Sequence, residues 1–232
     1  MDIVYILKNT KHNEELRYSL RSLKNVKGID RVVFAGGCPE DFICDYHIPV
    51  LQDQHLKYDN TTKILRAILE DENLSEKIVI MNDDFFIMQP LDLATYKNIF
   101  NGTLADQIFN IERANGNNIS RYTNKLRKAY ILLGVLGIDD PLNFETHTPF
   151  VCRRKYGRDV MELNFGLPFR TLYEHVLRNP KSKFKDHKIA DCETRPTGKE
   201  WILSTTDESF KNGKVGAYIR NKFKRKCKYE KI

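Results

Sequence analysis

The sequence predicts an α/β fold, with a mixed sheet flanked by helices and a more helical C-terminal half. Strand-like apolar runs alternate with helix-like periodicity over the first 90 residues, as in chains that build a sheet covered by helices. One run, Lys77 to Met81, is almost wholly apolar, as expected of a strand at the centre of a covered parallel sheet. A length of 232 residues is enough to bury a core.

The first elements follow from the spacing of apolar residues. Asp2 to Leu7 is a short β-branched run and predicts a buried strand, and Asp30 to Ala35 predicts a second. Between them, Glu15 to Asn25 predicts a helix, because three leucines repeat on one face: Leu16, Leu20 and Leu23.

A third strand is predicted near Pro49 to Leu51. The next helix is predicted to begin at a cap formed by Asn60, Thr61 or Thr62 and to run to about Asp71. The strand from Lys77 to Met81 follows it.

Beyond Pro90 the pattern is less regular. Asn101 to Asn118 is rich in asparagine and glycine, which favours a mobile loop. The later segments predict helices at Ile119 to Gly137, Arg153 to Leu163, Arg170 to Arg178 and Val215 to Phe223, and a strand at Glu200 to Ser204.

No repeat or linker divides the chain, so the sequence predicts a single domain over residues 1–232. Residues 1–100 would bind a nucleotide, residues 101–210 would form an acceptor or lid half, and residues 211–232 would form a basic helix and tail. Five scattered cysteines, no long apolar run and no leader-like N-terminus indicate a reduced, cytoplasmic protein without a disulfide framework.

The net charge of +7 is concentrated at the C-terminal end. Residues 211–232 contain nine basic residues and one acid, so they carry +8. A polyanionic partner or a solvated terminal helix would both explain this distribution. The candidate polyanion-binding residues are Arg220, Lys222, Lys224, Arg225 and Lys226.

Asp83 and Asp84 follow the apolar strand directly, where open α/β sheets bind their ligands. Adjacent carboxylates repel unless a cation lies between them, and Mg²⁺ or Mn²⁺ prefers oxygen donors. A solvated polar turn is the alternative, but the chain returns at once to apolar residues, FFIM. The pair therefore predicts a divalent-metal site.

Three blocks of the chain resemble conserved blocks of the Stealth proteins, which are sugar-phosphate transferases of capsule synthesis. They are ELRYSLRSL (Glu15 to Leu23), IVIMNDDFFIMQP (Ile78 to Pro90) and THTPFVCRRKYGRDVMEL (Thr146 to Leu163). The opening DIVYILKN is similar too, although Asn9 stands where that family usually has an acid. The resemblance implies a GT-A-like, Rossmann-type fold, a divalent metal, a metal-diphosphate site at Asp83 and Asp84, and a second active-site group at His147.

His147 lies in an E-T-H-T-P-F segment that Pro149 biases towards extended backbone. A neutral imidazole there could bind metal or act as general base, whereas a hydrogen-bonded structural histidine is the alternative. Asp207 is the other candidate base. Asp84 is the expected metal ligand, with Asp83 supporting it.

Cations are also needed to bind the donor's diphosphate. Arg17 and Arg21, one helical turn apart, are candidates, with exposed helix charges as the alternative. Lys8 and Asn9 at the end of the first strand, and Lys63 in the second helix, are further donor-binding candidates. Arg153 and Arg154 could hold donor or acceptor phosphate.

The sequence therefore predicts a metal-dependent glycosyltransferase that uses a nucleotide sugar, such as a UDP-sugar, with Mn²⁺ or Mg²⁺. The basic end slightly favours DNA with hydroxymethylated bases, in a phage-infected cell, as acceptor over a capsule or cell-wall glycan. Sugar-phosphate transfer is one alternative. A non-enzymatic nucleic-acid-binding protein is the alternative from another class.

Overall fold

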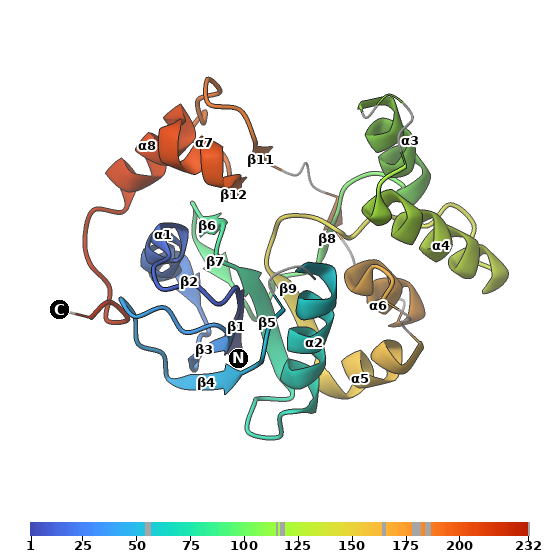
Figure 1. Cartoon of the computed structure of the whole chain (residues 1–232), viewed down its shortest axis with the longest axis horizontal. Coiled ribbons are helices and arrows are strands. Elements are labelled where there is room, and N and C mark those ends of the chain that lie inside the picture. The colour runs from blue at the N-terminus through green and yellow to red at the C-terminus, as the bar shows by residue number, and fades with distance from the viewer. Residues whose placement is uncertain are drawn as a thin grey trace. The chain divides into compact units, whose positions relative to one another are not determined.

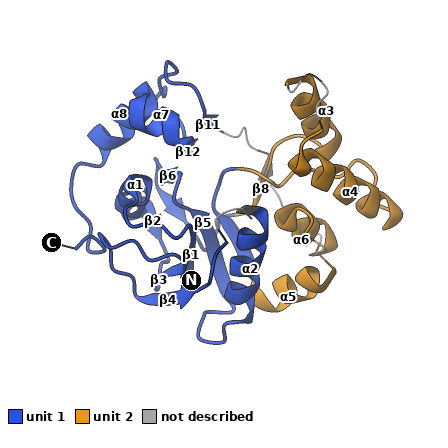
Figure 2. Ribbon diagram, viewed as in Figure 1, with its two compact units in different colours: residues 1–96, 147–152, 187–232 blue, residues 97–146, 153–186 orange. Residues whose placement is uncertain are grey.

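The computed structural model describes residues 1–53, 57–114, 116, 119–163, 166–177, 182–183 and 187–231. The chain divides into two compact units (Figure 2). Unit 1 contains residues 1–96, 147–152 and 187–232, and unit 2 contains residues 97–146 and 153–186. The C-terminal residues therefore belong to the same unit as the N-terminal sheet, which the sequence-based boundaries at 100 and 210 do not anticipate.

Unit 1 is built on a five-stranded sheet flanked by helices, with strand order β4-β3-β1-β5-β9 (Figure 1). β1 is parallel to both β3 and β5, and β3 is parallel to β4. The strands are β1 (Asp2–Leu7), β3 (Val32–Gly36), β4 (Tyr46–Pro49), β5 (Lys77–Asn82) and β9 (Phe150–Arg153), and the helices between the first four are α1 (Glu14–Ser22) and α2 (Lys57–Glu70). The predicted α/β fold with a helix-flanked sheet is confirmed.

The strand order reverses between β1 and β5. From β1 the chain passes to β3 on one side, continues outward to β4, and then returns through α2 to β5 on the other side. In open α/β sheets, ligands bind outside the carboxyl ends of the strands at such a reversal. The residues that follow β1 and β5 therefore occupy the favoured position for a site.

The remaining elements of unit 1 are a short helix (Leu23–Asn25), β2 (Val26–Lys27), β6 (Phe85–Ile87), β7 (Leu91–Asp92), β11 (Lys188–Ile189), β12 (Ile202–Thr205), α7 (Asp207–Asn212) and α8 (Lys214–Lys222). Of these, α7 and α8 pack against α1 and the antiparallel pair β6 and β12. The core of this part contains Phe86, Leu203 and Phe210, together with three residues from the end of the chain: Val215, Ile219 and Phe223. Their burial indicates that α8 is an integral part of this unit.

Gly216 of α8 is required by this packing. A Cβ added there would lie 1.7 Å from the carbonyl oxygen of Phe210. We expect Gly216→Ala to lower the free energy of unfolding by about 3 kcal/mol, because backbone would have to move. As a control, the Cβ of Gly134→Ala in the helix α4 (Arg121–Val135) meets nothing within 4 Å, so this variant should raise that free energy by about 1 kcal/mol. Urea unfolding of both variants would measure the difference, and an unchanged Gly216→Ala protein would contradict the packing.

Unit 2 is mainly helical. It contains β8 (Ile99–Phe100), α3 (Leu104–Ala114), α4 (Arg121–Val135), α5 (Arg154–Leu163), α6 (Phe169–Leu177) and β10 (Ser182–Lys183). The helices predicted over Ile119 to Gly137 and Arg153 to Leu163 are present, and so is the helix predicted from Arg170, whose last residue, Arg178, lies outside the described residues. No helix in the described part of the chain is long and apolar enough to cross a bilayer.

Most of the segment from Asn101 to Asn118, which the sequence predicts to contain a mobile loop, is the helix α3. The Oγ1 atom of Thr103 accepts the backbone N–H of Asp106 at 3.0 Å, while Asp106 accepts the N–H of Thr103 at 3.3 Å. Such reciprocal caps stabilise a helix start. Asn115, Asn117 and Asn118 lie outside the described residues.

Two boundaries also differ from the prediction. The third strand is Tyr46–Pro49, three residues earlier than the start expected at Pro49. α2 begins at Lys57, so Asn60 is inside the helix, and its amide group exchanges hydrogen bonds with the backbone of Asp53 instead of capping.

Candidate active site

Asp83 and Asp84 form the turn between β5 and β6, at the carboxyl end of β5. β5 pairs with β1 in a register that sets Asn82 beside Ile6, so the turn is adjacent to the end of β1. Both aspartates therefore lie at the reversal of strand order, as the sequence predicts.

The carboxylate of Asp83 is held by α1. The Nδ2 atom of Asn13 donates to Oδ2 of Asp83 at 2.6 Å, and Oδ1 of Asn13 caps the helix by accepting the N–H of Leu16 at 2.9 Å. Burial and the neighbouring charge of Asp84 raise the pKa of Asp83 to about 6, although the Asn13 bond lowers it. Asn13 thus couples the start of α1 to this carboxylate.

Asp84 is approached by groups from three other parts of unit 1. The Oγ atom of Ser204 donates to its Oδ2 atom at 3.0 Å, and Nζ of Lys188 lies 3.9 Å from the same atom. His147 packs edge-on against Phe85, with ring centroids 6.5 Å apart. Burial raises the pKa of Asp84, and Lys188, His147 and Ser204 partly offset that effect. The structure thus brings together Asp84 and His147, which the sequence analysis proposed jointly.

Glu15 is a third carboxylate in this region. It accepts a hydrogen bond from Oγ1 of Thr205 at 2.7 Å. Burial raises its pKa to about 7, and Asp83, Asp84 and Asp207 add to the shift. Asp207 is the first residue of α7, whose start is fixed by a capping box between Thr206 and Ser209. Four mutually repelling carboxyl groups therefore gather at one end of the sheet.

Asp83→Asn is expected to stabilise the metal-free protein at neutral pH. The raised pKa of Asp83 means that its contribution to stability is present below the unfolded value of 3.8 and is lost as pH rises through about 6. Above pH 6 the buried charge costs at most about 3 kcal/mol, which the amide removes. In the presence of chelator, the free energy of unfolding of Asp83→Asn should exceed that of the native protein near pH 7.5 and equal it near pH 4. The control Asp139→Asn, at an exposed position, should not change the free energy of unfolding at either pH. An equal gain for Asp83→Asn at both pH values would exclude this explanation.

The remaining predicted donor-binding residues lie at the end of β1 and on α2. Lys8 and Asn9 follow β1 and are exposed, and the N–H of Asn9 donates to Gln52 at 3.3 Å. The Oγ1 atom of the next residue, Thr10, is buried and has no hydrogen-bond partner among the described residues, so it could bind a ligand. Lys63 is exposed on α2.

The two arginines of α1, which the sequence predicts to bind phosphate, both make hydrogen bonds to Glu230. The Nε and Nη2 atoms of Arg21 donate to the two oxygens of Glu230, each at 2.7 Å, and Nη1 donates to the carbonyls of Phe223 and Lys224. Arg17 donates to Glu230 at 3.0 Å. The Arg21 side chain is buried and four of its N–H groups already donate to protein acceptors, which leaves little capacity for a phosphate.

The basic residues predicted to bind a polyanion or phosphate differ in exposure and in their contacts. Arg220 donates to the carbonyls of Phe210 and Lys211 and stacks on the Phe210 ring, so it holds α8 against α7. Lys222 is half-buried, whereas the remaining three are exposed: Lys224, Arg225 and Lys226. Arg153 is exposed and Arg154 buried, and both belong to unit 2.

Sequence reasoning missed four residues of the site: Asn13, Glu15, Lys188 and Ser204. Asn13 carries a usable signal, because an asparagine before a helix start is a common cap. Lys188 and Ser204 carry none, since they reach Asp84 from strands more than 100 positions later.

The site fits a metal that shares its coordination with a ligand. Among the described residues, no group of three or more histidine, cysteine or acidic side chains is arranged to hold an ion. Mg²⁺ and Mn²⁺ are often bound by one or two carboxylates, with water and substrate phosphates completing the shell. Asp84 and Asp83 supply such carboxylates, and desolvation raises the pKa of both, so a cation that binds their charged forms would offset this cost.

Comparison with known proteins gives structural likenesses alone. No family model and no curated protein matches the chain. The galactosyltransferase LgtC, solved with donor and acceptor sugar analogues, is 11% identical with a TM-score of 0.48, over 97% of this chain and 94% of that one. An active-site mutant of LgtC is 11% identical with a TM-score of 0.42, over 88% and 87%.

Proposed function

We propose that this chain is a metal-dependent glycosyltransferase that moves a sugar from a nucleotide sugar to an acceptor hydroxyl. The proposal rests on one observation: two adjacent, half-buried carboxyl groups lie at the reversal of strand order, and desolvation raises the pKa of both. A divalent cation with a diphosphate would relieve this charge, and open α/β sheets bind nucleotides at that position. The resemblance of the three sequence blocks to the Stealth proteins supports the same chemistry.

Each side chain has a role in this proposal. Asp84, oriented by Ser204, would hold the metal, and Asp83, fixed by Asn13, would support it. The metal supplies charge neutralisation for the leaving diphosphate. Lys188 lies close enough to Asp84 to contribute a second positive charge at the same place.

The donor's nucleoside would contact the end of β1. Lys8 and Asn9 are exposed there, and the unsatisfied Thr10 hydroxyl could bind a polar group of the base or ribose. Lys63 of α2 is a further donor-binding proposal.

Three groups are candidates for the general base. His147 and Asp207 are predicted from the sequence, and His147 is close enough to Asp84 to affect its pKa. Glu15 is added by the structure, because its pKa of about 7 suits proton transfer at neutral pH. Replacing each in turn with its amide, or with glutamine for His147, would show which one controls the pH profile of transfer.

Ligand binding tests the proposal before an acceptor is known. UDP-sugars and other nucleotide sugars should raise the melting temperature in the presence of Mn²⁺, and chelator should remove the increase. If no nucleotide sugar shifts the melting temperature with Mn²⁺ present, the transferase assignment fails. A shift in melting temperature that persists in chelator would support a nucleotide-binding site but contradict its dependence on a metal.

The acceptor is proposed to be a polyanion, with DNA carrying hydroxymethylated bases favoured over a cell-wall glycan. Lys224, Arg225 and Lys226 are consecutive and exposed, and Lys228 and Lys231 are exposed nearby. Such a run binds phosphate backbones with strong salt dependence. Sugar-phosphate transfer to a capsule or cell-wall polymer remains the alternative reaction at the same site.

Deleting residues 211–232 would not test this acceptor, since it would remove Val215, Ile219 and Phe223 from the core. The sharper variant replaces Lys224, Arg225 and Lys226 with glutamine, against a control that replaces Arg113, Arg121 and Lys128 of unit 2. Salt-dependent binding to duplex DNA should be lost in the first variant alone. If both variants bind DNA equally well, the basic residues at 224–226 do not form the DNA contact. Unchanged DNA binding by Asp84→Asn without any turnover by the native protein would favour the non-enzymatic alternative.

A further inference from the structure

Most of the net positive charge lies in unit 2 when the charge is counted by unit instead of along the sequence. Unit 2 contains 15 basic and 9 acidic residues, so it carries +6 of the net charge of +7. The basic residues at 211–232 belong to unit 1, where acidic residues elsewhere in the unit almost balance them. An anionic surface would therefore be attracted mainly to unit 2.

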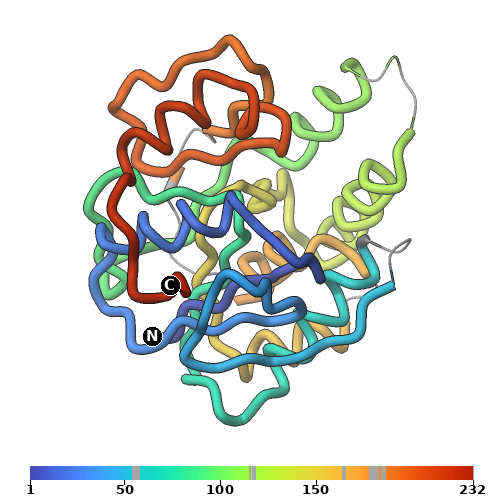
Figure 3. Tube along the Cα trace, turned by 60° about the vertical axis from the view of Figure 1, so that its left-hand side comes forward, coloured from blue at the N-terminus to red at the C-terminus, as the bar shows by residue number. Residues whose placement is uncertain are grey.

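Within unit 2, the helix α4 is rich in basic residues. It contains four of them and no acid: Arg121, Lys125, Arg127 and Lys128. Arg127 donates from its Nε atom to Glu112 of α3 at 2.8 Å. Figure 3 shows α3 in green and α4 in yellow-green as neighbouring helices. Two acids, Asp139 and Asp140, follow α4, so the helix and its C-terminal turn together remain basic.

The inner face of α4 belongs to the core of unit 2. Its buried residues repeat every three or four positions, and the helix packs against α3 and α6: Thr123, Leu126, Ala129 and Leu133. The Oγ atom of Ser120 caps the start of α4 by accepting the N–H of Thr123 at 3.0 Å. Gly137, at a φ of 74°, ends it. The helix therefore keeps one face in the core and turns the opposite face outward.

The outward face of α4 changes from basic to apolar along the helix. Residues 121, 124, 128, 131 and 135, here called the outer stripe, are all exposed and lie three or four positions apart. Arg121 and Lys128 stand in its first part, whereas Ile131 and Val135 end it with exposed fractions of 64% and 79%. Leu136 comes next and is 54% exposed. Single exposed apolar residues are ordinary, but a group of them at the end of a basic helix indicates an interaction surface.

We propose that the outer stripe of α4 binds the surface of an anionic lipid bilayer. Ile131, Val135 and Leu136 would enter the boundary between headgroups and acyl chains, while Arg121 and Lys128 would stay at the level of the lipid phosphates. The charge of unit 2 complements anionic headgroups, whereas a second copy of the chain would present the same positive charge. This proposal stands independently of the glycosyltransferase assignment, because it requires neither a nucleotide sugar nor a metal.

Co-sedimentation of the full chain with lipid vesicles tests the proposal. Phosphatidylcholine vesicles that contain about 30% phosphatidylglycerol should bind the protein at least about tenfold more tightly than pure phosphatidylcholine vesicles. Replacing Arg121 and Lys128 with glutamine should weaken this binding about twentyfold, because each basic residue near an anionic surface contributes about fivefold. As a control, replacing Lys224, Arg225 and Lys226 of unit 1 with glutamine should leave vesicle binding unchanged.

The apolar part of the stripe has its own variant. The double variant Ile131→Gln, Val135→Gln should weaken vesicle binding about tenfold or more, because less apolar area would enter the bilayer. Its melting temperature should stay near the native value, since both side chains are exposed in the free protein. The matched control Leu51→Gln, Leu163→Gln removes two other exposed apolar side chains and should bind vesicles as the native protein does.

Three results with vesicles would overturn the proposal: no binding to the anionic vesicles, equal binding to neutral ones, or native binding by the Ile131→Gln, Val135→Gln protein. Loss of binding only in the variant at residues 224–226 would place the bilayer contact in unit 1 and overturn it as well. Size-exclusion chromatography provides a further test. A native dimer that Ile131→Gln, Val135→Gln converts to a monomer would show that a second copy covers the stripe, and the proposal would be wrong.

Discussion

Asp84→Asn is expected to lower the rate of metal-dependent sugar transfer by about a hundredfold or more. The amide keeps the shape of the side chain and can still accept from Ser204. It removes the negative charge that would hold the cation beside the donor's diphosphate, and losing one preorganised electrostatic contact at a reacting centre costs about that much. The effect is measured as the turnover rate of a nucleotide sugar, monitored through the release of its nucleotide.

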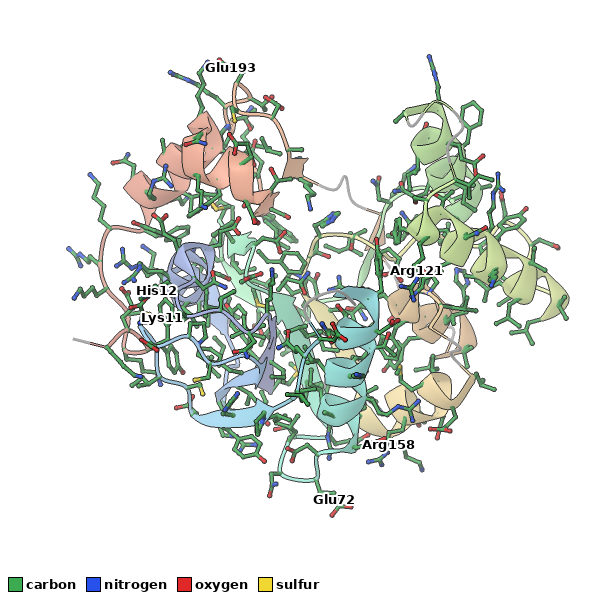
Figure 4. All side chains as sticks on the ribbon, in the orientation of Figure 1. Lys11, His12, Glu72, Arg121, Arg158 and Glu193 are labelled. Atoms are coloured by element: carbon green, nitrogen blue, oxygen red, sulfur yellow. The ribbon has the colours of Figure 1, made fainter. Side chains whose placement is uncertain are left out.

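The matched control is Glu72→Gln, which removes a carboxylate from the exposed loop after α2 (Figure 4). It should leave turnover and its Mn²⁺ dependence unchanged. Asp84→Asn should also remain folded, because burial already disfavours the Asp84 charge. Full turnover in a folded Asp84→Asn protein would exclude Asp84 as the metal ligand.

Arg21→Leu is expected to lower the free energy of unfolding by about 3–5 kcal/mol, since it leaves the Glu230 carboxylate buried without its main partner. Arg66→Leu breaks an exposed pair with Glu70 and should change stability by less than about 1 kcal/mol. The double variant Arg21→Leu, Glu230→Leu should recover part of the loss. If Arg21→Leu behaves like Arg66→Leu, the C-terminal residues are not held by this pair.

The same pair sets a pH dependence. Burial alone would raise the pKa of Glu230, but the hydrogen bonds from Arg21, the Cys227 N–H and Arg17 bring it down to about 2. Its contribution, about 3 kcal/mol, is present above the unfolded value of 4.5 and is lost as pH falls towards 2. Acid unfolding of Glu230→Gln should lack this component of the slope.

The fold was largely predictable because its main signals are local. The apolar runs of β1 and β5 and the leucine repeat of α1 lie where the strands and helix form. α3 was missed because flanking asparagines and glycines obscured a short amphipathic helix, whose cap depends on a threonine and an aspartate three residues apart.

The site was predictable only where one segment carries it. Asp83 and Asp84 stand out because two charges interrupt an apolar run. Lys188, Ser204 and Glu230 acquire their roles from contacts with residues more than 100 positions away, which no local pattern encodes. The same limit explains why Arg17 and Arg21 suggested phosphate binding: a helix face shows two cations but not the carboxylate they face.

The ion pair between Arg21 and Glu230 also has a consequence for biosynthesis. The two residues are 209 positions apart, so on the ribosome Arg21 stays without this partner until residue 230 has been made. Contacts that close so long a loop form late and slow the folding of the whole unit. A nascent chain halted before residue 230 should therefore be more sensitive to protease in its N-terminal sheet than the released protein, even though every strand of that sheet has already been synthesised.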